Sequence, residues 1–498
     1  ALVLTGCTSS GGDAGKDASG ETITMWVIGG DTPDELRTYL KDEFKKETGA
    51  TLKIEEQGWG DIITKLTSSL PDENNTPGVT EIGNTQSPTF TNVGAFLDIS
   101  DMYDELGGSD LLQSFVDAGT VDGKNYTLPY YFGSRYMFSR TDVWDAAGVA
   151  KPTTLDEFNA AVKTITEKNP KGIENFSGFY LGGQDWRDGI SWIFANGGDI
   201  ATLQDGKWVA TLDSPESMKG LEQLQGIYRD ASRAPNDAKD ANQYQFLNDS
   251  DTVTDEAGNT TDLSLAAATI MAPGWAHWSI GDLVTGEDGK PAREWNDATF
   301  GAWVLPGNDG KPAPVFAGGS NIGISAKTKN PELSKELMKI IFSEEYQTML
   351  GKNGLGPANQ KFTSSLGDDQ FAKALIESAS NSKLTPAAPG WAAVEAANVM
   401  EEFFSKIRDA DDLNALALEY NAKLDALLNT SNAFSFPVLS LVIFLPLIGA
   451  ALIAILPLAI LLYAVVPLIL RGQPYWLNVM TNAAILSFGS LGVWVTFA

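Results

Sequence analysis

The chain has few of the residues that covalent cross-links and many metal sites require. Its 498 residues include one cysteine, Cys7, and one histidine, His277. A single thiol excludes an internal disulfide, and a single imidazole excludes a His-rich metal site. Basic residues are also scarce, because 35 Lys and Arg stand against 64 Asp and Glu, for a formal net charge of −29. Such a surface repels nucleic acid and anionic lipid head groups, so we expect a neutral or cationic ligand and no nucleic-acid partner.

Charge is almost absent from the C-terminal end. After Asp425 the only charged residue is Arg471. Residues 426–470 would extend about 68 Å as a helix, enough for about two spans of a bilayer core. We interpret residues 429–498 as a hydrophobic, membrane-protein-like helical tail that is foreign to the body and artificially joined to it. A natural second membrane anchor and a buried helix pair are the alternatives.

The N-terminal residues have the pattern of a processing signal. Leu4-Thr5-Gly6-Cys7 resembles a bacterial lipobox, in which the cysteine takes a diacylglyceryl group, and we expect the printed chain to begin inside the signal peptide. Residues 8–20 are small, polar and rich in Gly and Ser, which is typical of a flexible tether. We therefore assign residues 1–20 to a signal remnant, lipobox and tether. A chance match before a disordered N-terminus is the alternative.

Strand and helix patterns alternate along the body. Residues 23–28 read as a strand, and a helix follows in which Thr32 is the expected cap and Glu35 closes a capping box, with Gly49 at its end. Thr154 with Glu157 opens a second such helix. Alternation of this kind predicts an α/β fold with a mostly parallel sheet.

Several segments resemble, in their order and spacing, the extracellular solute-binding proteins that serve sugar ABC importers. They are Glu81 to Pro88, Leu128 to Arg135, Ala195 to Asp199, Gly274-Trp275, Leu305 to Gly307 and Gly318 to Ser325. The Gly-Asn-Thr-Gln run in the first segment looks most like lipoproteins for chitobiose-type and other disaccharides.

The resemblance implies a two-lobed periplasmic-binding-protein-like fold with ligand in a cleft that closes by hinge motion. We expect residues 21–132 and 300–359 to form the N-terminal lobe, and 133–299 and 360–428 the C-terminal lobe. Chain crossings are expected near Phe132 to Ser134, Ala298 to Trp303 and Pro357 to Lys361.

A polar stretch from Asn248 to Asp262 is longer than the family pattern leads one to expect, and we interpret it as a solvated loop. The spacing of its Asp249, Asp251 and Asp255 matches no calcium loop. No catalytic triad or phosphate-binding loop appears in the sequence. We therefore expect no catalytic residues, no metal and no cofactor.

A sugar presents hydroxyls at its edge and C–H groups on its faces, so its site needs flat apolar rings and a few fixed polar groups. Trp59, Trp275 and Trp391 stand beside Gly in expected loops. Trp186 follows Gln184-Asp185, and Trp192 precedes the Asn-Gly-Gly segment. The resemblance favours Trp275 and Trp391 as platforms for sugar rings, and the other three are further candidates. Packing in the core is the alternative for each.

The polar candidates come from three places. Asn84, Thr85 and Gln86 follow a strand and offer uncharged amide and hydroxyl groups, although an Asn-stabilised turn would explain them equally. Tyr131 and Arg135 lie at the first expected crossing, where Arg135 either reaches the ligand or forms an ion pair across the hinge.

Gly319, Ser320 and Asn321 complete the candidate set, because glycines allow backbone to approach a ligand closely. A tight turn is the alternative. His277 is expected to pack or to make one hydrogen bond.

These features predict the extracytoplasmic substrate-binding subunit of an ABC transporter, which captures a disaccharide-type oligosaccharide and delivers it to permease subunits in the membrane. We expect a monomer held at the membrane by its lipid, with the tail as a further contact, and no enzymatic activity. The alternatives are a secreted carbohydrate-active enzyme, which would need paired carboxylates, and a membrane-anchored fusion with a transporter segment.

The lipobox generates a direct prediction. Replacing Cys7 with Ser should release the protein from the membrane fraction, because a diacyl group supplies the two chains that stable anchoring needs. Fractionation followed by immunoblotting measures this, in a chain that ends at Asn429 so that the tail does not contribute. Unchanged membrane association of that variant would contradict lipidation at Cys7.

Overall fold

A computed structural model describes residues 18–239, 243–249, 251–254, 260–263, 265–286 and 289–430. All of these residues belong to one compact unit. Cys7 and residues 431–498 of the expected tail lie outside the described residues. Within the described part, no helix is both long enough and apolar enough to cross a membrane.

One mixed sheet runs through the described body, in the order β11-β6-β15-β3-β1-β2, with β14 and β16 also paired to β6. Its strands are β1 Thr22–Ile28, β2 Thr51–Gln57, β3 Val79–Gly83, β6 Thr127–Arg140, β11 Thr269–Pro273, β14 Phe300–Trp303, β15 Ala317–Ile324 and β16 Gly356–Pro357. Strand β1 is parallel to β2 and β3, whereas every described pairing of β6 and β15 is antiparallel. The expectation of a mostly parallel sheet is therefore wrong, because strands that arrive from distant parts of the chain complete the sheet.

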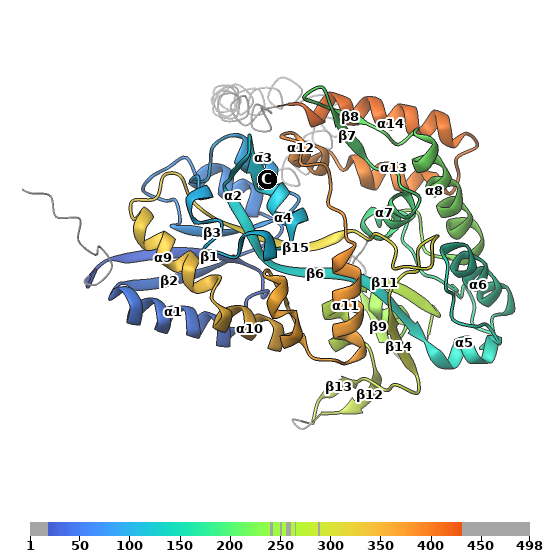
Figure 1. Ribbon diagram of the computed structural model, residues 1–498. Coiled ribbons are helices and arrows are strands. Elements are labelled where there is room, and N and C mark those ends of the chain that lie inside the picture. Colours follow the sequence, from blue (N-terminus) through green and yellow to red (C-terminus); the bar gives the residue numbers. More distant parts are fainter. Residues whose placement is uncertain are drawn as a thin grey trace, which may run out of the picture. The chain divides into compact units, whose positions relative to one another are not determined.

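Strand β6 contributes side chains to all three hydrophobic clusters of the described body, for example Tyr130, Phe138 and Met137. Its first part, from Thr127 to Ser134, pairs with β15, and its last part, from Arg135 to Arg140, pairs with β11 and β14. Figure 1 shows β6 running from the side of β1 and β3 to the side of β14 and α5. The change of partners coincides with the expected crossing near Phe132 to Ser134.

The first half of the body is built around β1, β2 and β3. Helices α1 Asp34–Thr48, α9 Pro331–Ile341 and α10 Glu344–Lys352 pack on these strands. Helix α1 contributes Leu36, Leu40 and Phe44 to this packing. As predicted, α1 ends at Gly49, which has a left-handed conformation with φ of 75°. The predicted capping box is wrong, because the Thr32 hydroxyl hydrogen-bonds Tyr130 Oη at 2.9 Å and the cap position is Pro33.

The second half surrounds a separate core. Its helices are α5 Thr141–Ala147, α6 Leu155–Lys168, α7 Trp186–Ala195, α8 Pro215–Gly226, α13 Val399–Ile407 and α14 Leu413–Leu428. The capping box at Thr154 and Glu157 of α6 is confirmed. Leu305 and Val315 pack in this core, which differs from the expected lobe boundary at residue 300. The chain returns to the first half only with β15.

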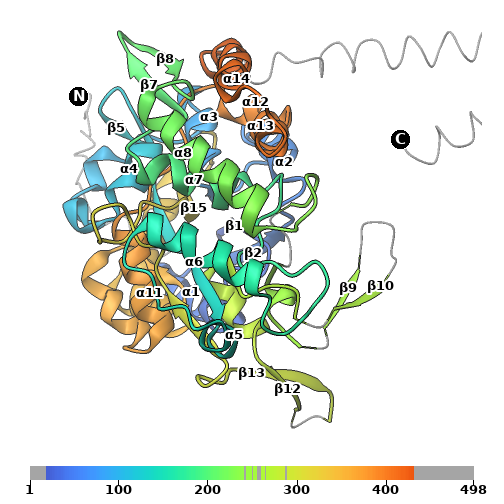
Figure 2. The same ribbon diagram turned by 90° about the vertical axis from the view of Figure 1, so that its right-hand side faces the viewer.

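Shorter elements complete the described body. They are α2 Ile62–Ser69, α3 Ser87–Asn92, α4 Gln113–Ala118, α11 Gln370–Ser380, α12 Trp391–Ala396, and the strand pairs β4 Thr120–Val121 with β5 Lys124–Asn125, β7 Ala201–Gln204 with β8 Lys207–Ala210, β9 Asp251–Thr254 with β10 Thr260–Leu263, and β12 Asp282–Thr285 with β13 Pro291–Glu294. Two of these hairpins, β9–β10 and β12–β13, project from the second half (Figure 2). The stretch expected to be a solvated loop thus contains a hairpin, because β9 and β10 pair in antiparallel register.

Candidate functional site

A polar cluster lies where β1 ends. The Trp59 indole N–H donates to Asp31 Oδ2 at 3.0 Å, and the Tyr131 hydroxyl donates to the same oxygen at 2.8 Å. Burial raises the pKa of Asp31, while the hydrogen bonds from Tyr131 and Trp59 lower it. Trp59 remains 42% exposed. The cluster therefore offers a held carboxylate beside an accessible aromatic ring.

Glycine at the end of β3 makes room for this cluster. A Cβ at Gly83 would stand 2.6 Å from Gln86 Oε1 and 3.2 Å from Trp59 Cζ3, so any larger residue would displace both side chains. The buried Gln86 Oε1 makes no hydrogen bond to the described residues. An acceptor of this kind is available to a ligand hydroxyl or amide.

A fully buried carboxyl group lies close to the cluster. Glu81 in β3 accepts a hydrogen bond from the Ile28 N–H at 2.8 Å. Burial, and after it the nearby Asp31, raise the pKa of Glu81 to about 8, against the opposing effects of Ser320, the Ile28 N–H and Arg37. Glu81 is therefore protonated at neutral pH and adds no full negative charge beside Asp31.

The second half contributes an aromatic and ionic group. Trp186 packs edge-to-face with Phe316 at 5.4 Å and with Trp391 at 6.1 Å between ring centroids. The Arg187 guanidinium lies 4.6 Å over the Trp186 ring and its Nη2 stands 3.9 Å from Glu395 Oε1. Cation–π and ionic contacts together hold the orientation of Arg187.

The two groups meet where α3 faces α12. The Thr85 hydroxyl donates to Glu395 Oε1 at 2.9 Å, and the Ala392 N–H donates to Thr89 Oγ1 at 3.2 Å. Burial raises the pKa of Glu395, and Arg187 and the Thr85 hydrogen bond oppose that rise. Hydrogen-bonding groups from both halves thus converge at one junction.

A buried ion pair fixes the second half to β6 beside this junction. Arg135 Nη1 lies 2.7 Å from Asp188 Oδ1, and both side chains are buried. Gln243 Nε2 donates to the other carboxylate oxygen at 3.4 Å. Of the two roles considered for Arg135, the structure therefore places it in an ion pair with helix α7.

Several of the polar candidates are bound within the fold. The Asn84 amide donates to the Ala317 carbonyl at 2.8 Å, and the Asn321 amide donates to the Phe115 carbonyl at 2.8 Å. Gly319 has φ of +137°, and a Cβ there would stand 2.5 Å from the Tyr131 carbonyl. Ser320 is fully buried, with its hydroxyl 3.4 Å from Tyr131 Oη. Close packing of β15 on its neighbours accounts for these residues.

The candidate tryptophans have different surroundings. Trp275 is 51% exposed and meets Tyr244 edge-to-face at 5.9 Å. Trp192 is fully buried and its indole N–H donates to Asn159 Oδ1 at 2.9 Å. Trp391 does not lie in a free loop as expected, because helix α12 begins at this residue and its ring is fully buried against Trp186.

Four residues at the junction were not predicted from the sequence: Asp31, Arg187, Phe316 and Glu395. Asp31 follows a Gly-Gly pair at the end of β1, which was the available signal for a strand-end site. Arg187 directly follows Trp186, and Glu395 lies four residues after Trp391, one helical turn away. Phe316 carries no local signal, because only its packing against Trp186 brings it to the junction.

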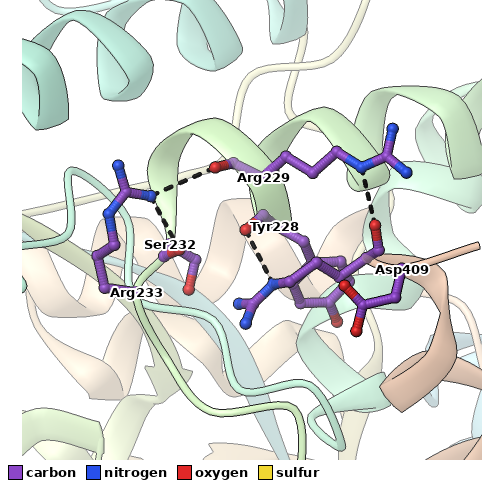
Figure 3. A pocket seen from close by; sticks show the side chains of 6 residues that line it. Tyr228, Arg229, Ser232, Arg233 and Asp409 are labelled. Carbon is purple, nitrogen blue, oxygen red and sulfur yellow. Dashed lines mark hydrogen bonds between the residues drawn. The ribbon is translucent and has the colours of Figure 1, made fainter.

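A separate concave surface gathers three arginines in the second half (Figure 3). This pocket of about 520 Å³ is lined by Tyr228, Arg229, Ser232, Arg233, Arg408 and Asp409. Arg229 Nε donates to the Arg408 carbonyl at 2.8 Å, and Arg408 Nε donates to the Tyr228 carbonyl at 3.0 Å. The two arginines thus cap the C-terminal ends of each other's helices, which explains the cluster as a structural one.

The family of bacterial extracellular solute-binding proteins matches residues 40–375. The diacetylchitobiose binding protein DasA of Streptomyces coelicolor is 32% identical over 403 residues, covering 79% of this chain and 87% of that protein.

Solved structures agree in fold. The sugar-binding protein MalE from Xanthomonas citri matches with a TM-score of 0.65 at 18% identity, over 82% of this chain and 97% of MalE. The GacH receptor of Streptomyces glaucescens, solved unliganded and with acarbose and an acarbose homolog, matches with a TM-score of 0.63 at 19% identity, over 83% and 99% of the two chains. The predicted two-lobed α/β binding-protein fold is confirmed.

The protonated state of Glu81 predicts a pH-dependent stability. Its folded pKa of about 8 exceeds the ordinary value of 4.5, so its contribution is complete below about pH 4.5 and is lost as pH rises through 8. Glu81→Gln keeps the shape of the protonated form, and its melting temperature relative to wild type should be about 2 °C or more higher at pH 8 than at pH 5.

Thermal unfolding of both proteins at pH 5, 7 and 8 measures this difference. Glu377→Gln, which removes a carboxylate from an exposed position on α11, serves as the control for loss of one negative charge. A melting-temperature difference for Glu81→Gln that stays constant from pH 5 to pH 8 would argue that Glu81 is ionised in the fold.

Proposed function

Because the chain belongs to the family of bacterial extracellular solute-binding proteins, we propose that it captures a diacetylchitobiose-type disaccharide at the junction of its two halves for a sugar ABC importer. The observation that carries this proposal is the Trp59–Asp31 pair at the end of β1. An indole that is 42% exposed offers a face for the C–H groups of a sugar ring, and the adjoining carboxylate accepts from hydroxyls at the ring edge.

The second half supplies the opposing groups. Trp275 has an exposed indole, and Arg187 and Glu395 are charged groups held in fixed orientations by Trp186 and Thr85. We propose as ligand-contacting residues Trp59, Thr85, Gln86, Tyr131 and Trp275 from the sequence prediction, with Asp31, Arg187 and Glu395 added. Trp186 and Trp391 are fully buried, and together with Arg135 and Ser320 they hold these side chains in place.

Release requires the halves to part. The contacts that would break include those from residues 85–89 to α12, such as Thr85 to Glu395 and Thr89 to Ala392. Both are single hydrogen bonds, so opening them costs little beside the binding energy of a micromolar ligand, about 8 kcal/mol. We propose hinge motion about β6 and β15, with the second crossing at β15.

The relative DasA is named as a binding protein, and we propose capture without turnover for this chain as well. The family is extracellular, and we further propose that Cys7 carries a lipid anchor outside the cytoplasmic membrane. The protein would then act as a tethered monomer that delivers sugar to permease subunits. A secreted carbohydrate-active enzyme is the alternative, and it would release cleaved sugar.

Two exposed indoles provide the test of the proposed site. Trp59→Ala and Trp275→Ala should each weaken binding of diacetylchitobiose at least about tenfold, because aromatic hot spots are typically worth about 2 kcal/mol or more. Their melting temperatures should change less than that of a core tryptophan variant, since about half of each side chain is open to solvent. Isothermal titration calorimetry and thermal unfolding measure the two effects.

Trp144→Ala is the matched control. Its indole N–H donates to Thr269 Oγ1 at 3.0 Å and its ring packs edge-to-face on Trp303, so truncation should lower the melting temperature and leave affinity intact. Normal binding by both Trp59→Ala and Trp275→Ala would place the site elsewhere. Hydrolysis of labelled chito-oligosaccharide by the wild-type protein would favour the enzyme.

A further inference from the structure

A second concave surface borders the residues of the proposed site. This pocket of about 440 Å³ lies within the range of small-ligand sites, about 300–1,000 Å³. Pro33 lines it from the first half, and the turn Gly274–Ser279 lines it from the second through Gly274, His277 and Trp278. Loop residues after α10 and the start of α11 complete the wall.

The wall at the turn is aromatic and rigid. Trp278 is 59% exposed, and a Cβ at Gly354 would stand 3.2 Å from its Cζ2, so the indole edge rests on a glycine. His277 stacks on Phe371 at 4.5 Å and lies 4.4 Å from the Trp278 ring centroid. The Gly274 carbonyl, 2.6 Å from His277 Nδ1, fixes the imidazole further. Trp278 therefore presents an indole on a prearranged support.

The rim of the pocket is polar without a dominant charge. Lys352 and Asp369 are exposed and of opposite sign, and the half-buried Asn353 also lines the pocket. Burial lowers the pKa of His277, so the imidazole is neutral at pH 7. The pocket thus combines an aromatic platform, the Asn353 amide, and two side chains whose charges cancel. Such a lining suits a neutral polyhydroxylated ligand better than an ion.

Both walls continue the proposed sugar site. Gly274 directly precedes Trp275, and Pro33 lies two residues after Asp31. Tyr136, which also lines the pocket, donates from its hydroxyl to the Gly274 carbonyl at 3.3 Å. A linear sugar chain that leaves the space between Asp31 and Trp275 on this side would enter the pocket.

We infer that this pocket is an additional subsite that takes the third and later units of a linear N-acetylated oligosaccharide, with Trp278 as its platform. The inference rests on the proposed function and adds a preference for chain length. The disaccharide occupies the junction, and longer chains gain contacts only beyond it. Loss of Trp278 should therefore affect long ligands and spare the short one.

The test uses the full chain and three ligands of the same chemistry: N-acetylated chito-oligosaccharides of two, three and four units. We expect wild-type affinity to rise by on the order of tenfold from two units to four, as one well-placed aromatic contact provides. Trp278→Ala should abolish this gain and keep the disaccharide affinity. Trp278→Phe, which keeps a ring, should retain part of the gain.

Leu283→Ala is the control, because Leu283 is 53% exposed on the projecting strand β12 and does not line the pocket. It should behave as wild type with all three ligands. Equal wild-type affinity for two and four units, or a full gain in Trp278→Ala, would overturn the subsite while leaving the proposed function standing. Failure of the wild-type protein to bind the disaccharide would overturn both.

Discussion

The structure depends on one backbone ladder, in which β6 contributes to three hydrophobic clusters. Strand β15 can lie against the middle of β6 only because glycines meet there: a Cβ at Gly318 would stand 2.6 Å from the Gly133 carbonyl. Larger residues would force the strands apart where β6 changes partners. The ends of β1 and β3 in the first half and the turn at Trp275 in the second are positioned by this ladder. A junction with side chains from both halves follows from it.

Charge is distributed around the junction so that no buried carboxylate faces another without compensation. Asp188 has Arg135, Glu395 has Arg187 and Thr85, and Glu81 is neutralised by protonation. Uncompensated buried charges would cost several kcal/mol each, so these pairings are a condition of forming the junction. They also leave it suited to a neutral ligand, consistent with a chain of net charge −29.

Sequence patterns predicted what local interactions decide. The capping box of α6 and the glycine end of α1 each depend on residues only a few positions apart in the sequence, and both were predicted. The predicted cap at Thr32 is wrong because the Thr32 hydroxyl is hydrogen-bonded to Tyr130, which lies 98 residues away in the sequence. Trp391 was misjudged because its burial depends on Trp186, and the role of Asp31 depends on Tyr131. Contacts between distant segments determine these outcomes, and no local pattern carries them.

The central claim is that a sugar is held by both halves at once. Amide hydrogen exchange of the full chain with and without diacetylchitobiose tests it most directly, because exchange reports local opening segment by segment. The account predicts slower exchange on adding sugar in segments 29–33, 57–61 and 83–87 of the first half and, together with them, in 185–189, 273–279 and 391–396 of the second. Slower exchange confined to one half, or centred on residues 227–233 and 407–410 around the arginine pocket, would contradict it.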